Sequence, residues 1–293
     1  MASLKDIRSR IDSTKNTQQI TKAMKLVSAA KLRRAQHQIV NMRPYAATLL
    51  KVIADIVVTN RVSHPLMQMP RETKKVLLVV LTSDRGLAGA FNSNINKYAE
   101  AYHKENKSKL EKLDFLFVGR RGNDFFVRRG VKPIETILKL DKDVSYKLAS
   151  HVAERLMKDY LDGHYDEIRL IYNEFKSAIS QKVVTETVLP IDITQNTFDV
   201  KNALPSFSTD MIYEPSPEKI IDQLLVKVFS IQIYRAMCES VAAEHGARMS
   251  AMENATNNAK EMISKYTLIY NKVRQEKITT ELTEIVSGAE SLK

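Results

Sequence analysis

The chain of 293 residues has few of the residues that build cross-linked or sharply turning folds: one cysteine, no tryptophan, eight glycines and eight prolines. A single cysteine, Cys238, excludes an internal disulfide and a cysteine-cluster metal site, and its apolar surroundings predict a small core residue. Scarce glycine and proline favour helix. No apolar run approaches the roughly 20 residues that span a bilayer, and the N-terminal MASLKDIRSRIDS has no signal-peptide core. We therefore expect a cytosolic, unprocessed protein without direct lipid insertion.

Acidic residues are scarce near the N-terminus. Residues 1–60 hold eleven Lys or Arg against three Asp, a net charge of +8, within a chain total of +11. Residues 214–293 hold ten basic and eleven acidic residues, a net charge of −1. This imbalance favours an acidic partner surface, nucleic acid or an anionic membrane, although the basic residues also fit a solvated coiled-coil face.

Both ends of the chain predict long helices. Apolar and small residues recur at alternating steps of 3 and 4 from Leu4, which is the spacing of a left-handed coiled-coil seam. The seam positions are Leu4, Ile7, Ile11, Thr14, Gln18, Thr21, Lys25, Ser28, Leu32, Ala35, Ile39, Met42, Ala46, Leu49, Ile53 and Ile56. Pro44 predicts a kink near Arg43. Two helices from opposite termini predict an antiparallel coiled coil.

The N-terminal seam is polar between Thr14 and Ser28. Within that gap the apolar residues move to another face of the helix, at Ile20, Ala23, Met24, Val27 and Ala30. The shift favours contact with something other than the intramolecular partner. A local stutter in an ordinary coiled coil is the alternative.

Residues 218–293 contain no proline, and Pro215 and Pro217 suit the entry to a helix. At 1.5 Å per residue, helices of about 56 and 76 residues extend roughly 80 and 110 Å, so the C-terminal helix is predicted to overhang its partner. A first apolar stripe ends near Glu276, and we expect the later apolar tip to require burial in another protein. The first stripe is Met252, Ala255, Ala259, Met262, Tyr266, Ile269 and Val273, and the tip runs from Ile285 and Val286 to Leu292.

The middle of the chain alternates between predicted strands and helices, which indicates an α/β domain with a mainly parallel sheet. Strands are predicted at 75–82, 114–119, 132–138, 167–173 and, as an edge strand, 183–193; helices are predicted at 92–106 and 144–162. The fold class is therefore α/β with long helices: an antiparallel coiled coil of the N- and C-terminal helices plus a Rossmann-like α/β domain. The predicted domains are 1–60, 75–193, a linker or foot at 194–217, and 218–293.

No convincing active site emerges. The turn Ser83–Asn92 carries glycines between a strand and a helix, but it lacks both the P-loop and the GxGxxG pattern, so a tight turn capped by Ser83 or Asp84 is favoured over a phosphate site. A second, basic turn at Val118–Gly122 likewise lacks both phosphate-binding patterns. The six histidines lie far apart without metal-ligand spacing, and no nucleophile motif is present. No stacking platform or recognition module supports nucleic-acid binding.

Five sequence segments resemble the gamma subunit of bacterial F-type ATP synthases. They are KDIRSRI at 5–11, NTQQITKAMK at 16–25, TSDRGL at 82–87, YEP at 213–215 and ITTELTEIVSGA at 278–289. They follow the family's order, and the resemblance covers essentially the whole chain. The plant-type insert with two cysteines is missing, so thiol regulation of that kind is not expected.

The resemblance implies the central rotor shaft, a non-catalytic subunit without cofactor or metal, which couples ion-driven rotation of the c-ring to ATP synthesis or hydrolysis in the beta subunits. The implied partners are the alpha, beta and epsilon subunits and the c-ring, at the cytoplasmic side of the bacterial membrane, where the protein would be peripheral. Nucleic acid is not an implied partner.

The resemblance also implies three sets of contact residues. Those facing the beta subunits are Arg8, Arg10, Lys22, Met24, Lys25, Arg248, Gln275 and Thr279. Those of the foot that meets the c-ring and epsilon are Met211, Tyr213 and Glu214. Those of the bearing tip are Ile285, Val286 and Leu292. The alternatives are a basic coiled-coil adaptor or nucleic-acid-binding protein, and a nucleotide-binding enzyme that uses the Ser83–Asn92 turn.

Overall fold

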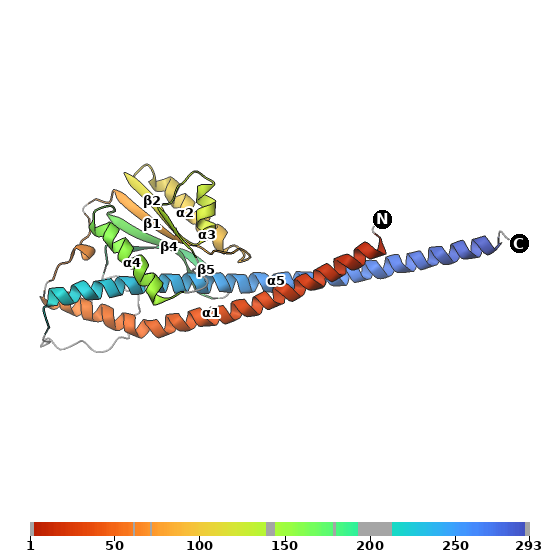
Figure 1. The fold of residues 1–293 in the computed structure, drawn as a ribbon, viewed down its shortest axis with the longest axis horizontal. Coiled ribbons are helices and arrows are strands. Elements are labelled where there is room, and N and C mark those ends of the chain that lie inside the picture. The colour runs from red at the N-terminus through yellow and green to blue at the C-terminus, as the bar shows by residue number, and fades with distance from the viewer. Residues whose placement is uncertain are drawn as a thin grey trace. The chain divides into compact units, whose positions relative to one another are not determined.

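The computed structural model describes residues 3–60, 62–70, 72–138, 144–177, 180–192 and 213–290. The chain divides into two compact units (Figure 1). The helical unit comprises residues 1–28 and 248–293, and the α/β unit comprises residues 29–247. Two long helices, α1 (Leu4–Asn60) and α5 (Pro217–Glu290), contribute to both units. Residues 194–212, most of the predicted linker, lie outside the described residues, as does residue 193 at the end of the predicted edge strand.

A five-stranded sheet forms the centre of the α/β unit, in the order β3-β2-β1-β4-β5. The strands are β1 (Lys75–Leu81), β2 (Lys112–Val118), β3 (Glu135–Ile137), β4 (Glu167–Phe175) and β5 (Gln181–Leu189). The pairs β1–β2, β2–β3 and β1–β4 are parallel, whereas β5 returns antiparallel to β4 at the edge. Strand β1 is apolar and buried almost throughout, as expected for a central parallel strand covered on both faces.

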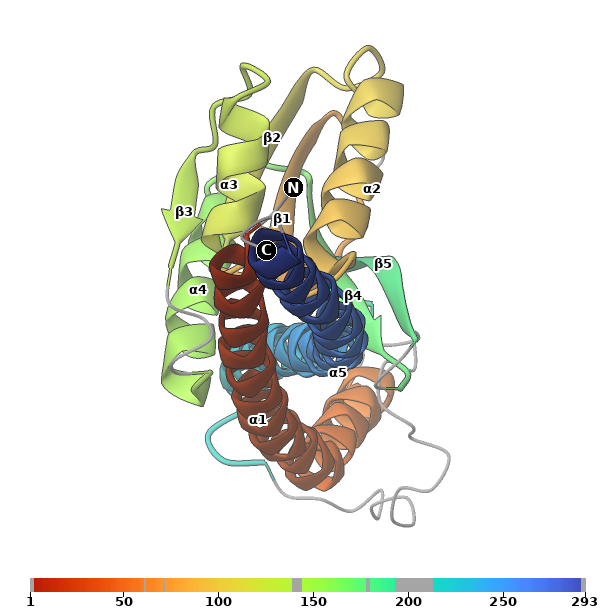
Figure 2. The same ribbon diagram turned by 90° about the vertical axis from the view of Figure 1, so that its right-hand side faces the viewer.

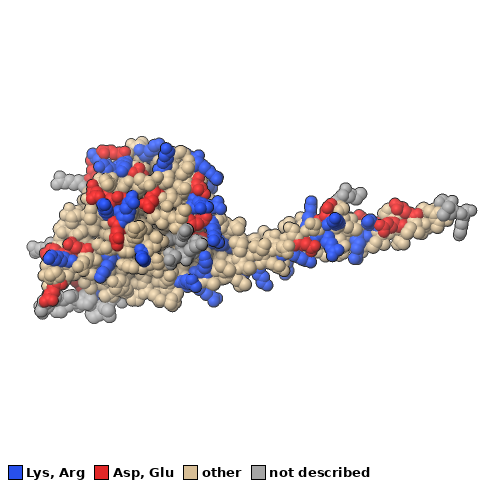
Figure 3. Space-filling view, in the orientation of Figure 1, with Lys and Arg blue, Asp and Glu red and all other residues tan. Residues whose placement is uncertain are grey.

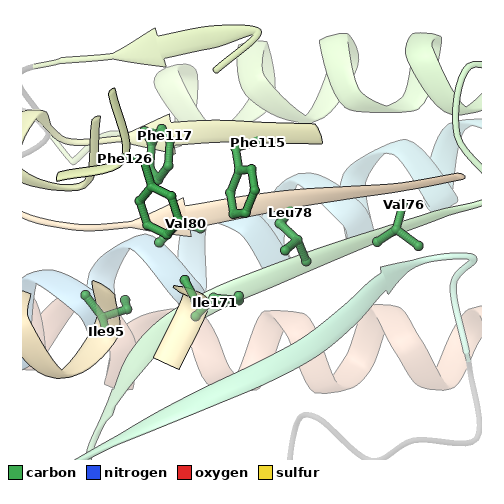
Figure 4. Close-up of a cluster of buried hydrophobic side chains, with 9 residues drawn as sticks. Val76, Leu78, Val80, Ile95, Phe115, Phe117, Phe126 and Ile171 are labelled. Carbon is green, nitrogen blue, oxygen red and sulfur yellow. The ribbon is translucent and has the colours of Figure 1, made fainter. Parts of the chain in front are cut away.

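One face of the sheet is covered by α2 (Phe91–Asn106), which contacts β4 and β5, and by α3 (Arg120–Val127), which contacts β2 and β3; the two helices lie side by side (Figure 2). Alternate residues of each strand point to this face. Figure 4 shows the resulting core, in which Phe115 stacks parallel to Phe117 and both rings contact the ring of Phe126. The members of this core are Val76, Leu78, Val80, Ile95, Ala99, Phe115, Phe117, Phe126 and Ile171.

The opposite face of the sheet packs against α4 (Tyr146–Leu161) and the part of α5 that belongs to this unit. Tyr172, which follows Ile171 on β4 and therefore points to this second face, donates to Glu186 Oε2 (2.9 Å) and accepts from Arg235 Nη1 of α5 (3.1 Å). Tyr146 of α4 contacts Tyr234 of α5 edge-on, with ring centroids 6.2 Å apart. Layers on both faces make the unit an α/β sandwich.

In the α/β unit α1 packs along α5 through the predicted seam. The seam positions Leu32, Ala35, Ile39, Met42, Ala46, Leu49, Ile53 and Ile56 are all buried. Gln38 of α1 lies opposite Cys238 of α5, with Oε1 4.0 Å from Sγ. Burial raises the pKa of the Cys238 thiol to about 12, so the prediction of an unreactive core cysteine is confirmed. Helix α1 continues through Pro44 without a break.

The fold class is confirmed: long helices accompany a mainly parallel sheet with an antiparallel edge strand. The third predicted strand is shorter than expected, at Glu135–Ile137. The basic turn predicted at Val118–Gly122 is wrong, because residues from Arg120 onward form α3. Gly119 takes a left-handed φ of +108° there, so the chain leaves β2 and enters a helix within one residue. A short 3-10 turn at Pro65–Met67 was not anticipated either.

Candidate functional site

The helical unit contains most of the residues expected to contact partners, and its two helices run antiparallel (Figure 1). Thr21 Oγ1 lies 2.8 Å from Thr256 Oγ1, and Lys25 Nζ lies 2.7 Å from Glu253 Oε1. Residue numbers rise along α1 while they fall along α5, which establishes the antiparallel direction. Lys25 and Glu253 remain 36% and 50% exposed, so this ion pair is a surface contact.

The polar part of the α1 seam faces α5. Thr21 and Ser28 are only 8% and 2% exposed, while Thr14, Gln18 and Lys25 are half-buried. The 3–4 spacing read from Leu4 is therefore kept through the polar segment, and a local stutter is not what moves the apolar residues. Ile20 and Val27, on the shifted apolar stripe, are 60% and 58% exposed, and Leu26 beside them is 64% exposed. Met24 is half-buried.

The α5 seam differs from the predicted one. The shared positions Met252, Ala259, Tyr266 and Val273 are buried or half-buried, as expected. Met262 and Ile269, however, are 43% and 47% exposed. The predicted Ala255 is half-buried as well, and so are three residues that were not predicted: Thr256, Ile263 and Tyr270. Both sets have a mean period of 3.5 residues, so the apolar pattern alone did not distinguish them.

The contact between Thr21 and Thr256 also fixes where α1 ends along α5. Two antiparallel helices advance equally per residue, so Leu4, 17 residues before Thr21, lies level with Val273, 17 residues after Thr256. Val273 is half-buried, and every residue from Arg274 to Ala289 is exposed. The predicted overhang of the C-terminal helix is thus present within this unit, and it begins at Arg274.

The overhanging part of α5, residues 274–289, is exposed at every position. Its apolar residues occur at spacings of 4, 3 and 1, which places them on one face of the helix. They are Ile278, Leu282, Ile285 and Val286, exposed by 49%, 58%, 67% and 61%. Leu292, the last residue of the predicted bearing tip, lies outside the described residues. Acidic side chains gather towards this end of α5, and basic ones are scattered along the unit (Figure 3).

The other predicted shaft contacts differ in accessibility. Arg8, Arg10 and Lys22 are exposed on α1, which carries no acidic residue between Asp12 and Asp55. Gln275 and Thr279 are exposed on α5, where the Thr279 hydroxyl donates to the Gln275 carbonyl (2.9 Å). Arg248, by contrast, is only 7% exposed.

The predicted foot lies at the start of α5. Tyr213 is half-buried and Glu214 is exposed, whereas Met211 lies outside the described residues. Ser216 accepts from the Lys219 N–H (3.4 Å), as a helix N-cap does, and Pro217 occupies the first helical position. A hydrogen bond within Glu218 and one to Ser216 hold the pKa of the Glu218 carboxyl below its usual value.

The Ser83–Asn92 turn is a capped structural turn. The first three N–H groups of α3 all donate to Thr82 or to residues of this turn. Arg120 N–H donates to Asp84 Oδ1 (3.0 Å), Arg121 N–H to the Ser83 carbonyl (3.0 Å) and Gly122 N–H to Thr82 Oγ1 (2.9 Å). A phosphate would need such N–H groups to be available. Ser83 N–H in turn donates to Asn92 Oδ1 (3.0 Å). The geometry therefore favours the capped turn over a nucleotide site.

A buried charge cluster in the α/β unit was missed from the sequence. Arg235 donates to both oxygens of Glu186, to Glu239 Oε1 (3.1 Å) and to the Tyr172 hydroxyl. Burial lowers the pKa of Arg235, but the neighbouring Tyr172, Glu186 and Glu239 raise it by more, so the pKa lies above its ordinary value. The sequence does show two opposite charges, Arg235 and Glu239, four residues apart in an apolar helical stretch, which indicates a buried ion pair. Nothing in the sequence points to Glu186 as a further partner.

Neither a metal site nor a membrane span is found in the part of the chain that the structure describes. No three His, Cys, Asp or Glu side chains come together there in a way that suits a metal ion. None of the described helices combines the length and the apolarity needed to cross a bilayer.

Comparison with known proteins gives matches along the whole chain. A family model described as ATP synthase matches residues 3–292. An ATP synthase gamma chain of Bdellovibrio bacteriovorus is 70% identical over 294 residues, covering all of both chains, and one of Geobacter sp. is 46% identical over 297 residues, again covering both.

Solved structures agree on the fold. A chain from the central stalk and c-ring of the Tetrahymena thermophila mitochondrial ATP synthase has a TM-score of 0.61 and 28% identity, covering 80% of this chain and 99% of that one. A chain from the Euglena gracilis mitochondrial ATP synthase, in an assembly of OSCP, F1 and c-ring, has a TM-score of 0.68 and covers 99% of this chain and 94% of that one. At 22% identity, the second likeness concerns the fold alone.

Proposed function

Because the chain belongs to the ATP synthase gamma-chain family, we propose that its helical unit is the part of the rotor shaft that turns inside the ring of alpha and beta subunits. A gamma chain is a non-catalytic subunit of the complex, and ATP is made or hydrolysed in the beta subunits. The chain's contribution is a coupling free energy between the c-ring and those sites.

The overhang of α5 is the observation that carries this proposal. Sixteen consecutive exposed helical residues, 274–289, with an apolar face at Ile278, Leu282, Ile285 and Val286, gain nothing from folding of this chain alone. An apolar helix face of that kind is stabilised only when a partner buries it. A sleeve at the top of the alpha–beta ring fits it, with Ile285, Val286 and Leu292 as the bearing tip.

Exposed basic residues of α1 support contact with acidic loops of the beta subunits. Arg8, Arg10 and Lys22 are accessible there, and Met24 lies on the same helix as the exposed Ile20 and Val27. We assign Gln275 and Thr279 to contacts on the α5 side, where hydrogen bonds are made and broken as the shaft turns. For the buried Arg248, such a contact requires the side chain to become accessible in the complex.

In the α/β unit, we assign Tyr213 and Glu214, with Met211, to the foot that meets the c-ring and epsilon. With this foot on the c-ring, the proposed location of the chain is the cytoplasmic side of the bacterial membrane, as a peripheral subunit. The basic charge of α1 is accounted for by the acidic loops of beta, so no nucleic acid is required as a partner.

Reconstitution tests the proposal. The purified chain, mixed with alpha, beta and epsilon subunits, should enter one complex with ATPase activity. If the chain stays monomeric in that mixture and no ATPase develops, the proposal fails. Saturable nucleotide binding by the isolated chain would instead support the enzyme alternative and its Ser83–Asn92 turn.

A further inference from the structure

Helix α5 offers α1 two overlapping apolar stripes. Both include Met252, Ala259, Tyr266 and Val273, four residues spaced by sevens. One stripe fills the intervening positions with Ala255, Met262 and Ile269, and the other fills them with Thr256, Ile263 and Tyr270. Because successive residues differ by about 100° around a helix, exchanging one stripe for the other requires α5 to rotate about its own axis.

Apolar burial does not explain why the second stripe is used. It places the hydroxyl of Thr256 against α1 where the first would place the methyl group of Ala255, and it leaves Met262 and Ile269 about half exposed. A hydroxyl in a helix interface is costly unless it is hydrogen-bonded. Here Thr256 donates to the Met252 carbonyl (2.7 Å) and lies 2.8 Å from the Thr21 hydroxyl, itself within reach of the Gln18 carbonyl (3.0 Å).

The ion pair between Lys25 and Glu253, at the surface of the helix pair, is a second polar contact between α1 and α5. Lys25 follows Thr21 by four residues and Glu253 precedes Thr256 by three, so the two polar contacts lie about one turn apart along the antiparallel pair. Polar contacts within a coiled-coil interface fix register and partner face more than they add stability. Two such contacts, one turn apart, fix both the axial position and the rotation of α5.

We propose that Thr21–Thr256 and Lys25–Glu253 together select which stripe of α5 faces α1, and so which side chains the shaft presents outward. Lys25 is then a positioning residue that acts on Glu253 of its own chain. It is not a contact to the beta subunits. The selection concerns this chain alone; its effect on coupling rests on the proposed function.

Disulfide trapping tests the selection in the full chain, in a Cys238→Ala background. Thr14 and Ile263 lie one heptad beyond the threonine pair, so Thr14→Cys with Ile263→Cys should cross-link, and Thr14→Cys with Met262→Cys should cross-link poorly. Lys25→Glu should lower the yield of the cross-link to position 263 about two- to five-fold and raise the yield of the cross-link to position 262. The change is modest because an exposed ion pair contributes little free energy. Adding Glu253→Lys should restore both. Yields that do not respond to Lys25→Glu overturn the proposal.

Coupling in the assembled complex gives the second readout, measured in membrane vesicles as proton pumping per ATP hydrolysed. Lys25→Glu should lower this ratio, and Lys25→Glu with Glu253→Lys should return it to the parent value. The exposed Lys22 is the matched control, because Glu253→Lys should not rescue Lys22→Glu. If the charge-swapped chain stays as uncoupled as Lys25→Glu, Lys25 contacts a partner and the proposal is wrong.

The two readouts separate the two proposals. If the parent chain does not assemble with alpha and beta, the proposed function fails, while the cross-linking result still decides which stripe of α5 faces α1 and whether Lys25 selects it.

Discussion

At the scale of single residues, Arg235 shows how the α/β unit holds its part of α5. One guanidinium serves two carboxylates, Glu186 and Glu239, and the Tyr172 hydroxyl, with both ends of the Arg235–Glu186 pair at most 16% exposed. Replacing one member of a buried pair leaves the other charge without its partner, at a cost of about 3–5 kcal/mol. This cluster therefore fastens β4 and β5 to α5.

Glu239 is the weaker partner in this cluster, and its titration predicts a pH effect. Burial raises the pKa of the Glu239 carboxyl. Arg235, which also pairs with Glu186, lowers this pKa by less, and the nearby Glu174 and Glu186 raise it further. A carboxyl with a raised folded-state pKa binds its proton more tightly when folded. Its contribution to stability therefore falls as pH rises from its ordinary value of 4.5 through the raised pKa.

Glu239→Gln, which keeps an acceptor for Arg235, should remove that fall. We expect the unfolding temperature of the variant to rise relative to the parent as pH increases from about 4.5 towards 7, measured by calorimetry. Glu261→Gln, at an exposed position of α5, is the matched control for the substitution itself. A parallel pH profile for Glu239→Gln and the parent would contradict the assignment.

Gly119 gives a second prediction at this scale. Its φ is +108°, and a Cβ there would lie 2.1 Å from the Thr82 carbonyl oxygen, so Gly119→Ala forces backbone to move. We expect a loss of about 3 kcal/mol or more in unfolding free energy, measured by urea titration. Gly130→Ala, at φ +79° with no atom within 4 Å, isolates the backbone strain and should cost about 1 kcal/mol. Equal losses in the two variants would show that the clash has no effect.

At the scale of elements, the overhang of α5 separates the chain's own stability from that of the complex. Deleting residues 275–293 removes side chains that are exposed wherever the structure describes them. The isolated chain should keep its unfolding temperature, while the complex with alpha and beta should dissociate more readily and retain some rotation. Gel filtration after dilution measures the dissociation.

Tyr266→Ala is the contrasting variant, because Tyr266 is half-buried in the seam with α1. It should destabilise the isolated chain by about 1–3 kcal/mol. If the deletion destabilises the isolated chain as much as Tyr266→Ala does, the overhang has an intramolecular role and the bearing assignment is wrong.

The elements were predicted well where a single pattern governs them. The α1 seam from Leu32 to Ile56 and the apolar run of β1 follow directly from spacing and composition. Thr256 was missed because Ala255 fits the same period, and α3 was missed because RRGND lacks a helical stripe and its N–H groups are capped by residues 36 to 40 positions away. Two partners of Arg235, Tyr172 and Glu186, come from β4 and β5, and pairing over such separations has no local signal.

At the scale of the whole molecule, the basic charge of α1 predicts a coupling defect. Lys22 is exposed, and no ion pair is found for it among the described residues, so Lys22→Glu should leave the fold intact. We expect proton pumping per ATP hydrolysed to fall several-fold at low salt while assembly is retained, since reversing a charge opposite an acidic loop acts on that contact. Lys104→Glu, on α2, is the control and should leave coupling unchanged. Equal loss of assembly and coupling in Lys22→Glu would contradict the prediction.

Rotation of this chain within the assembled head tests the central claim most directly. With the alpha–beta ring fixed to a surface and a probe attached near the start of α5, ATP should drive stepwise rotation in one direction, at a rate that follows hydrolysis. A probe that stays still, while the same complexes hydrolyse ATP, would contradict the account of this chain as a shaft.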